Sequence, residues 1–313
     1  MTIDLDGQYR ALREEAGFFM PERGVLRVRG AESLEYLQGQ LTNDVEALAP
    51  GAGCYAALLD RKGRMQADMR VLNLGDEGVW LDLEPEATSA ALAHLRMYSV
   101  GRELEIEDAT DRWQVLSLIG PRAGQLCGFE ALRPEYAQRR RVWDGVEVIG
   151  VGTRFGVDVL VAAGDAISIM GQLRSAGVAE VAEDAAEILR VEAGIPRFGR
   201  EMTTVTIPQE AGINERAVSF TKGCYIGQET VARLHYKGKP NRQLRGLRLE
   251  HPAQDGDPVT FEGREVGRIG SAVVSPAHGP VALAILRREV TPGDRVLVSG
   301  RIAAEVAEVP LSQ

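Results

Sequence analysis

The stretch at residues 222–229, Lys-Gly-Cys-Tyr-Ile-Gly-Gln-Glu, carries the residue types for thiol chemistry. Lys222 places a cation close to Cys224, and a nearby cation favours the thiolate, which is the nucleophilic form. The two glycines of the stretch allow a positive φ or the close approach of a ligand. A helix that begins near Ile226 would lower the pKa of the thiol further. We therefore expect a reactive Cys224 tuned by Lys222; the alternative is a structural cysteine buried in a turn.

The chain offers Cys224 no partner of a known catalytic pattern. His235 lies eleven residues further on, which does not match a cysteine–histidine protease. A working thiol would act through its own pKa, as a soft nucleophile or a redox group. The three cysteines are far apart, without a Cys-x-x-Cys or a paired-histidine motif, so the sequence predicts no structural zinc and no protein-held iron–sulfur cluster.

Glu192 is the second candidate. It falls on the apolar stripe of a predicted helix at 183–193, together with Ala185, Ile188 and Leu189. A carboxylate on the core-facing side of a helix C-terminus opposes the macrodipole and needs a partner, either an arginine or a ligand with N–H donors. Fraying of the helix end, which would turn the side chain to solvent, is the alternative.

Three further acidic or amide side chains are weaker candidates. Asn43 and Asp44 follow a predicted helix, where they either line a ligand or only cap a loop. Asp68 lies in a predicted strand at 66–74, and the period of two leaves open whether it faces the core or solvent.

A basic stripe without acidic residues runs from 233 to 248 in an otherwise acidic chain. It would bind an anionic small-molecule tail or RNA phosphates, or it is a solvated hairpin. Its cations are Arg233, Lys237, Lys239, Arg242, Arg245 and Arg248.

Composition narrows the class of protein. The net charge of −9 and the pI near 5.2 argue against a general nucleic-acid binder. The polar, acidic start is wrong for a signal peptide, and no apolar run approaches the length of a membrane span. We expect a cytoplasmic, reduced protein.

The elements that position these residues read as α+β. Up to about residue 243 short turn-linked strands alternate with helices, which favours antiparallel units over a doubly wound sheet. Helical periodicity then stops, and short strands separated by Pro/Gly turns predict a small β-barrel or sandwich. Helices are expected at 8–16, 33–41, 86–97, 166–175 and 183–193; strands at 25–28, 55–60, 66–74, 78–83, 115–119, 146–151, 157–161, 244–249, 257–261, 265–274, 281–286 and 295–308.

Five segments, taken in order, resemble the YgfZ family, folate-binding relatives of the glycine-cleavage aminomethyltransferase (T-protein, GcvT). The resemblance runs from about Tyr9 to the C-terminus, and the last segment is highly specific. The segments are 37–45 (LQGQLTNDV), 62–64 (KGR), 189–196 (LRVEAGIP), 208–212 (PQEAG) and 222–229 (KGCYIGQE).

The resemblance implies a three-domain cloverleaf around a folate channel. Its parts would be an α+β folate-binding domain at 1–110, a second α+β domain with the KGCYIGQE motif at 111–243, and a C-terminal β-barrel at 244–313. The glutamate that matches Glu192 hydrogen-bonds the pterin of tetrahydrofolate in T-proteins, which gives a buried carboxylate its partner. Asn43, Asp44, Tyr225, Gln228 and Arg233 are the other expected contacts of tetrahydrofolate or of a one-carbon derivative.

Two departures from T-proteins are relevant to function. Where T-proteins have an Asp-Asp pair, this chain has Ala67-Asp68, which leaves the catalytic role of Asp68 open. Where bacterial T-proteins have an aspartate in the last motif, this chain has Cys224. YgfZ proteins are linked to assembly or repair of iron–sulfur proteins and to cluster enzymes that modify tRNA.

We therefore expect a tetrahydrofolate-binding accessory protein with transient iron–sulfur enzyme or assembly-factor partners. The catalytic candidates are Cys224, Lys222 and Asp68. The alternative is an aminomethyltransferase-like one-carbon transferase that depends on Asp68. A third possibility, an RNA-binding module that uses the basic stripe, fits the acidic pI least.

Overall fold

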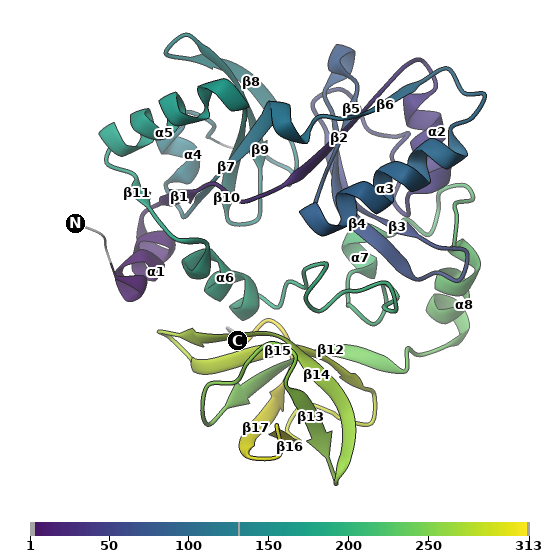
Figure 1. Ribbon diagram of the computed structural model, residues 1–313, viewed down its shortest axis with the longest axis vertical. Helices are drawn as coiled ribbons and strands as arrows, with labels where there is room; N and C mark the ends of the chain where they lie inside the picture. The colour runs from purple at the N-terminus through teal and green to yellow at the C-terminus, as the bar shows by residue number, and fades with distance from the viewer. Residues whose placement is uncertain (1–3, 131, 312–313) are drawn as a thin grey trace. The chain divides into compact units, whose positions relative to one another are not determined.

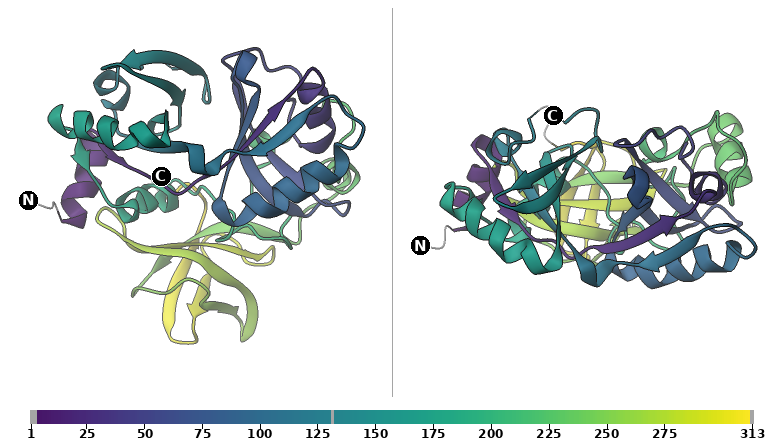
Figure 2. Two further views of the ribbon diagram at one scale, coloured as in Figure 1. Left: turned by 45° about the horizontal axis from the view of Figure 1, so that its top comes forward. Right: turned by 90° about the horizontal axis from the view of Figure 1, so that it is seen from above.

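The computed structural model describes residues 4–130 and 132–311 (Figures 1 and 2). It contains a five-stranded sheet, a six-stranded sheet and a closed β-barrel. The predicted α+β class with a C-terminal barrel is therefore confirmed. Among the described residues, no helix is both long and apolar enough to cross a membrane.

The five-stranded sheet has the order β3-β4-β5-β2-β6. Two helices, α2 (Ser33–Gln40) and α3 (Pro85–Tyr98), accompany it, and the Tyr36 hydroxyl joins them by donating to the Leu95 carbonyl. Four strands were expected, whereas β6 was not. The strands are β2 (Gly24–Arg29), β3 (Gly53–Leu59), β4 (Met65–Asn73), β5 (Val79–Leu83) and β6 (Glu105–Asp108).

The six-stranded sheet has the order β11-β1-β7-β10-β9-β8. One pair departs from the expected antiparallel pattern, because β1 runs parallel to β11. Strand β1 comes from the N-terminal segment, so the sheet is not made from residues after 110 alone. The strands are β1 (Gly17–Phe19), β7 (Trp113–Ile119), β8 (Gln138–Trp143), β9 (Val146–Gly152), β10 (Gly156–Ala162) and β11 (Ala179–Glu180).

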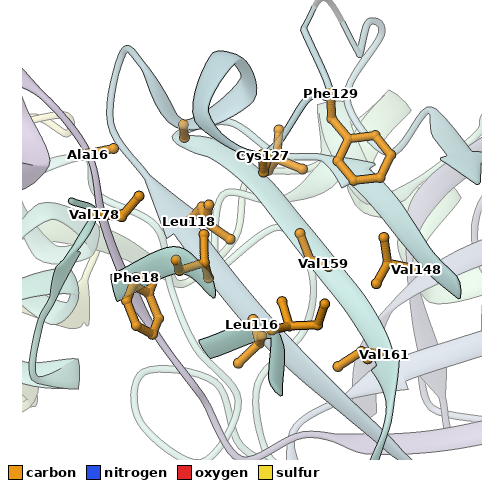
Figure 3. Packing of buried hydrophobic residues seen from close by; sticks show 14 of the residues in the cluster. Ala16, Phe18, Leu116, Leu118, Cys127, Phe129, Val148, Val159, Val161 and Val178 are labelled. Carbon is orange, nitrogen blue, oxygen red and sulfur yellow. The ribbon is translucent and has the colours of Figure 1, made fainter. Parts of the chain in front are cut away.

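One apolar core lies on this sheet, and Figure 3 shows its side chains. Phe18 of β1 packs with Leu118 of β7 and Val159 of β10. Helix α5 (Ala166–Ser175) covers this core with Ile169 and Leu173, both fully buried. Helix α1 (Leu5–Glu14) is as long as α5, whereas α4 (Ala123–Leu126) is a single short turn.

The barrel closes in the order β12-β15-β14-β13-β16-β17 (Figure 1). The single strand expected at 295–308 is two strands, because Ser299 and Gly300 both take a positive φ and turn the chain. The barrel strands are β12 (Arg242–Leu249), β13 (Pro258–Phe261), β14 (Arg264–Ser275), β15 (Gly279–Arg287), β16 (Arg295–Val298) and β17 (Ile302–Ala307).

Three helices lie between the six-stranded sheet and the barrel in sequence: α6 (Glu183–Glu192), α7 (Asn214–Ala217) and α8 (Gln228–Lys237). Helix α6 was expected. The hairpin reading of residues 233–248 is wrong, because α8 ends at Lys237 and the segment continues as β12. Val231 and Leu234 stand three residues apart among mostly polar residues, which fits a helix with one buried position, Val231.

The chain forms two compact units. The first comprises the chain up to Leu59, Gln66–Ala185 and Ala217–Ile226; the second comprises Asp60–Met65, Ala186–Arg216 and the chain from Gly227 onward. The expected domain boundaries at residues 110 and 243 stay predictions.

Candidate functional site

Cys224 lies exposed on the loop before α8. The alternative of a buried structural cysteine is therefore wrong. Of the two neighbouring glycines, Gly227 has a positive φ of 86°, which a residue with a Cβ rarely adopts. The next residue, Tyr225, is buried, and burial raises the pKa of its phenol to about 12. The loop thus presents the thiol while it buries the adjacent ring.

Lys222 fixes this loop through its ammonium group. Its Nζ donates to the backbone carbonyls of Gln38, Leu41 (2.6 Å) and Asn43 (3.0 Å). The ammonium also lies 5.0 Å from the centre of the Tyr225 ring, within cation–π distance. The three carbonyl oxygens, called the carbonyl cage below, thus accept one hydrogen bond from each of the three N–H donors of the ammonium group.

Burial lowers the pKa of Lys222 to about 8, against the opposing fields of Asp44 and then Cys54. The positive charge of Lys222 acts on the pKa of the Cys54 thiol on β3. Burial raises this pKa to about 12, and the charge of Lys222 partly opposes the rise. The expected tuning of Cys224 by Lys222 stays a prediction.

Backbone contacts bring two of the family-like segments together within the first unit. The Ile226 amide donates to the Gly39 carbonyl (3.3 Å) and the Ser219 amide to the Thr42 carbonyl (3.0 Å). The Thr42 hydroxyl donates to the Ala217 carbonyl (2.6 Å). Segment 37–45 is therefore the support on which the cysteine loop rests.

Asn43 and Asp44 lie in the loop after α2, as expected, and both have structural contacts. Asn43 Nδ2 donates to the Tyr55 carbonyl (2.8 Å), and Asp44 Oδ1 accepts from Gln38 Nε2 (2.8 Å). Their expected contact with a ligand stays a prediction.

Asp68 has an unusual environment on β4. Its Oδ2 accepts a 2.6 Å hydrogen bond from the Tyr55 hydroxyl on β3. Its Oδ1 is buried and has no hydrogen-bond partner among the described residues. Burial raises the pKa of Asp68 to about 6; Tyr55 lowers it, Glu84 raises it and Arg23 lowers it. A carboxyl group that titrates near neutrality can act as a general acid or base.

The alternation of β4 resolves which face carries Asp68. Ala67 and Met69 are buried in the core, so Asp68 lies on the opposite face with Arg70. That face is not solvated as a polar strand face usually is, because Arg70 bonds the fully buried Asp82 of β5 (2.6 Å). The sequence left open whether Asp68 faces the core or solvent. In the structure it does neither, because it lies on a partly buried polar face of the sheet.

This polar face contains an ion-pair network that the sequence analysis missed. Arg23 also bonds Asp82 (2.6 Å), and Arg70 reaches Asp158 of β10, which accepts from Ser117 (2.6 Å). The network therefore joins the two sheets of the first unit. Arg70 and Asp82 face each other across β4 and β5. Opposite charges at facing strand positions could have predicted this ion pair, but only if the register of the two strands had been known.

Glu192 lies in the second unit, at the end of α6, and is 2% exposed. The prediction of a core-facing carboxylate is confirmed, and the frayed alternative is wrong. Ser275 Oγ donates to Glu192 Oε1 (2.6 Å) while accepting from the amides of Ala277 and His278 (3.0 Å each). The two amides direct the hydroxyl hydrogen at the carboxylate. Ser275 was missed; its signal is a buried serine at the end of a barrel strand.

Two expected contacts of the cofactor lie in α8, also in the second unit. Gln228 is the first helical residue and is half-buried, and Arg233 is exposed. Their roles stay predictions. No group of three or more histidine, cysteine or acidic side chains is arranged for a metal ion in the described ranges.

Comparison with known proteins agrees with this architecture. Residues 4–136 match the model of the GCVT N-terminal domain. An aminomethyltransferase of Rubrobacter xylanophilus is 30% identical over 98% of this chain and 86% of its own length. An uncharacterized protein of Haemophilus influenzae is 30% identical over 80% of this chain and 81% of its own length.

A solved structure shows the same fold. The crystal structure of glycine cleavage system aminomethyltransferase T from Bartonella henselae aligns with a TM-score of 0.85 at 22% identity, over 98% of this chain and 89% of that one. The expected GcvT-like fold is thereby confirmed. Together with the 30% identity over nearly the whole chain, these matches show that the chain belongs to the GcvT, or aminomethyltransferase-like, family.

Proposed function

We propose that this protein binds tetrahydrofolate and acts in the cytoplasm as an accessory factor for the maturation or repair of iron–sulfur enzymes, including those that modify tRNA. The observation that carries the proposal is the exposed Cys224 on a loop braced by Lys222. A thiol that stands where bacterial T-proteins have a carboxylate fits a redox or nucleophilic role better than proton transfer.

Two features of the residues fit a reduced pterin. Glu192 is a buried carboxylate whose Oε1 accepts a hydrogen bond from Ser275. A carboxylate has about four acceptor positions, so it can also accept paired N–H bonds from a pterin ring. Separately, in the first unit, the buried Oδ1 of Asp68 has no hydrogen-bond partner among the described residues and could accept from an amine-bearing ligand. Tetrahydrofolate would supply ring nitrogens that carry a one-carbon unit.

The accessory role is tested in cells that lack the wild-type protein. Cys224→Ser should fail to restore iron–sulfur enzyme activities under oxidative stress, whereas the matched Cys54→Ser, at a half-buried thiol, should restore them. Full restoration by Cys224→Ser would contradict the proposal.

A folate-dependent one-carbon transferase is the second candidate, and the Asp68–Tyr55 pair favours it. A carboxyl group with a pKa of about 6 is suited to proton transfer at an amine. The assay is formation of methylenetetrahydrofolate from formaldehyde equivalents or a lipoyl-carrier adduct. Turnover that Asp68→Asn abolishes would establish the transferase and overturn a purely accessory role.

A further inference from the structure

A pocket of about 450 Å³ in the second unit lies where β12 begins and β15 ends. One of its residues, Arg242, belongs to the basic stripe of the sequence analysis, and none of its residues belongs to the thiol loop or is a contact proposed for the pterin. Three of its six lining residues are arginines. The lining consists of Glu210, Asn241, Arg242, Arg287, Arg288 and Glu289.

Strand pairing forces the arginines together. Arg242 and Arg287 stand directly opposite each other in the antiparallel β12–β15 pair. The Arg288 amide donates to the Asn241 carbonyl (2.9 Å), which holds the third arginine beside them. Like charges at facing positions of two strands destabilise a sheet. The pairing therefore has a cost that a bound anion would remove.

None of the three guanidinium groups forms an ion pair or hydrogen bond to another side chain within the described residues. A neighbouring pocket of about 770 Å³ shares Arg242 and Arg287, and there the other exposed arginines are paired. Arg200 bonds Asp255, and Arg268 bonds Glu265 (2.9 Å). Arg242 and Arg287, which line both pockets, thus form no ion pair with any side chain in the described part of the chain, although Glu210 lies within the field of Arg242.

The acidic residues of the pocket do not balance this charge. Three arginines and two glutamates leave a formal charge of +1 in a chain whose net charge is −9. Glu210 is half-buried, and its pKa is raised by burial against the opposing field of Arg242. The Oε2 atom of Glu210 accepts a hydrogen bond from the backbone amide of Ile207 (3.4 Å), three residues earlier in the chain. Glu289 is exposed to solvent.

We propose that this pocket binds a small oxyanion with paired terminal oxygens, of the phosphate or carboxylate type. The planar guanidinium fork of arginine matches such oxygens in a bidentate geometry, which an ammonium group does not. The ligand would bridge Arg242 and Arg287 and relieve their repulsion. The site is independent of the folate proposal, since it shares no residue with it.

Isothermal titration of the whole protein with pyrophosphate and with citrate tests the site and separates the two ligand types. At least one anion should bind saturably, and Arg242→Gln or Arg287→Gln should weaken binding by about tenfold or more. The matched control is Arg295→Gln, which removes an exposed barrel arginine outside the pocket. It should change affinity less than about twofold, as expected for a screened surface charge.

Stability supplies a second readout. The anion that binds should raise the thermal midpoint of the wild type but not that of Arg287→Gln. Without anion, Arg287→Gln should be at least as stable as the wild type, because it removes one of two facing like charges. Saturable binding of neither anion, or equal weakening by Arg295→Gln and Arg287→Gln, would overturn the site.

Discussion

Tyr55 donates a 2.6 Å hydrogen bond to one oxygen of Asp68, while the other oxygen is buried without a partner among the described residues. The two residues stand on neighbouring strands β3 and β4. The hydrogen bond from Tyr55 thus orients the carboxyl group of Asp68 through Oδ2, while Oδ1 is available to accept from a ligand. Burial outweighs the hydrogen bond and brings the pKa of Asp68 to about 6.

The raised pKa of Asp68 makes stability depend on pH. Between pH 3.8, its ordinary pKa, and about pH 6, the folded state binds more protons than the unfolded state. The contribution of the protonated carboxyl is therefore present below pH 3.8 and lost as pH rises through about 6. Asp68→Asn, which cannot ionise, should gain stability relative to the wild type over this window, by no more than about 3 kcal/mol. Urea unfolding at pH 4 and pH 7 measures this; a constant difference would contradict it.

The carbonyl cage should make Lys222 necessary for the order of the cysteine loop. Lys222→Met removes the three Nζ hydrogen bonds, so the Ile226 amide should exchange its hydrogen about tenfold faster or more. Lys239→Met, at an exposed position, is the control and should leave this amide unchanged. Hydrogen exchange followed by NMR gives both rates. Equal protection in Lys222→Met would show that the cage does not order the loop.

The three cysteines should differ sharply in reactivity. Cys224 is exposed, whereas burial raises the pKa of Cys54 to about 12 and that of Cys127 to about 11. Brief alkylation of the native protein at pH 8 should therefore modify one thiol per chain, and none in Cys224→Ser. Intact mass spectrometry counts the adducts. Rapid labelling of the Cys224→Ser variant would be inconsistent with this environment.

The Arg70 network should be costly to break. Arg70 pairs with Asp82, which is fully buried, and with Asp158. Arg70→Leu leaves buried carboxylates short of a counter-charge and should destabilise the protein by about 3–5 kcal/mol. Arg102→Leu, which removes exposed pairs with Glu32 and Glu35, should cost much less stability, because exposed ion pairs contribute little. Chemical denaturation compares the two; similar losses would refute the role of the network.

Local patterns in the sequence predicted most of the fold. The helix at 183–193 was found because its apolar stripe is regular, and that stripe also placed Glu192 in the core. Strand β1 was missed because three residues are too short for a periodic signal, and its pairing with β7 and β11 is a long-range contact. The start of α8 was considered near Ile226, two residues before its first residue, but its extent to Lys237 was not predicted, since most of its residues are polar.

The candidate site was predictable in its residues but not in their partners. Cys224, Lys222 and Glu192 stand out by residue type and position. The partners of Asp68 and Glu192, Tyr55 and Ser275, come from strands whose register the sequence does not specify. For the same reason, the sequence placed Lys222 beside Cys224, whereas its ammonium reaches carbonyls more than 170 residues earlier in the chain.

Titration of the purified protein with tetrahydrofolate tests the central claim most directly. The wild type should bind saturably. Glu192→Gln should weaken binding by about tenfold or more, because the protein loses the charged carboxylate that would accept N–H hydrogen bonds from the pterin. Asp184→Asn, at an exposed position of the same helix, should bind as the wild type does. Thermal unfolding of Glu192→Gln checks that the variant is folded. Absence of binding, or equal affinity of the wild type and Glu192→Gln, would contradict the assignment.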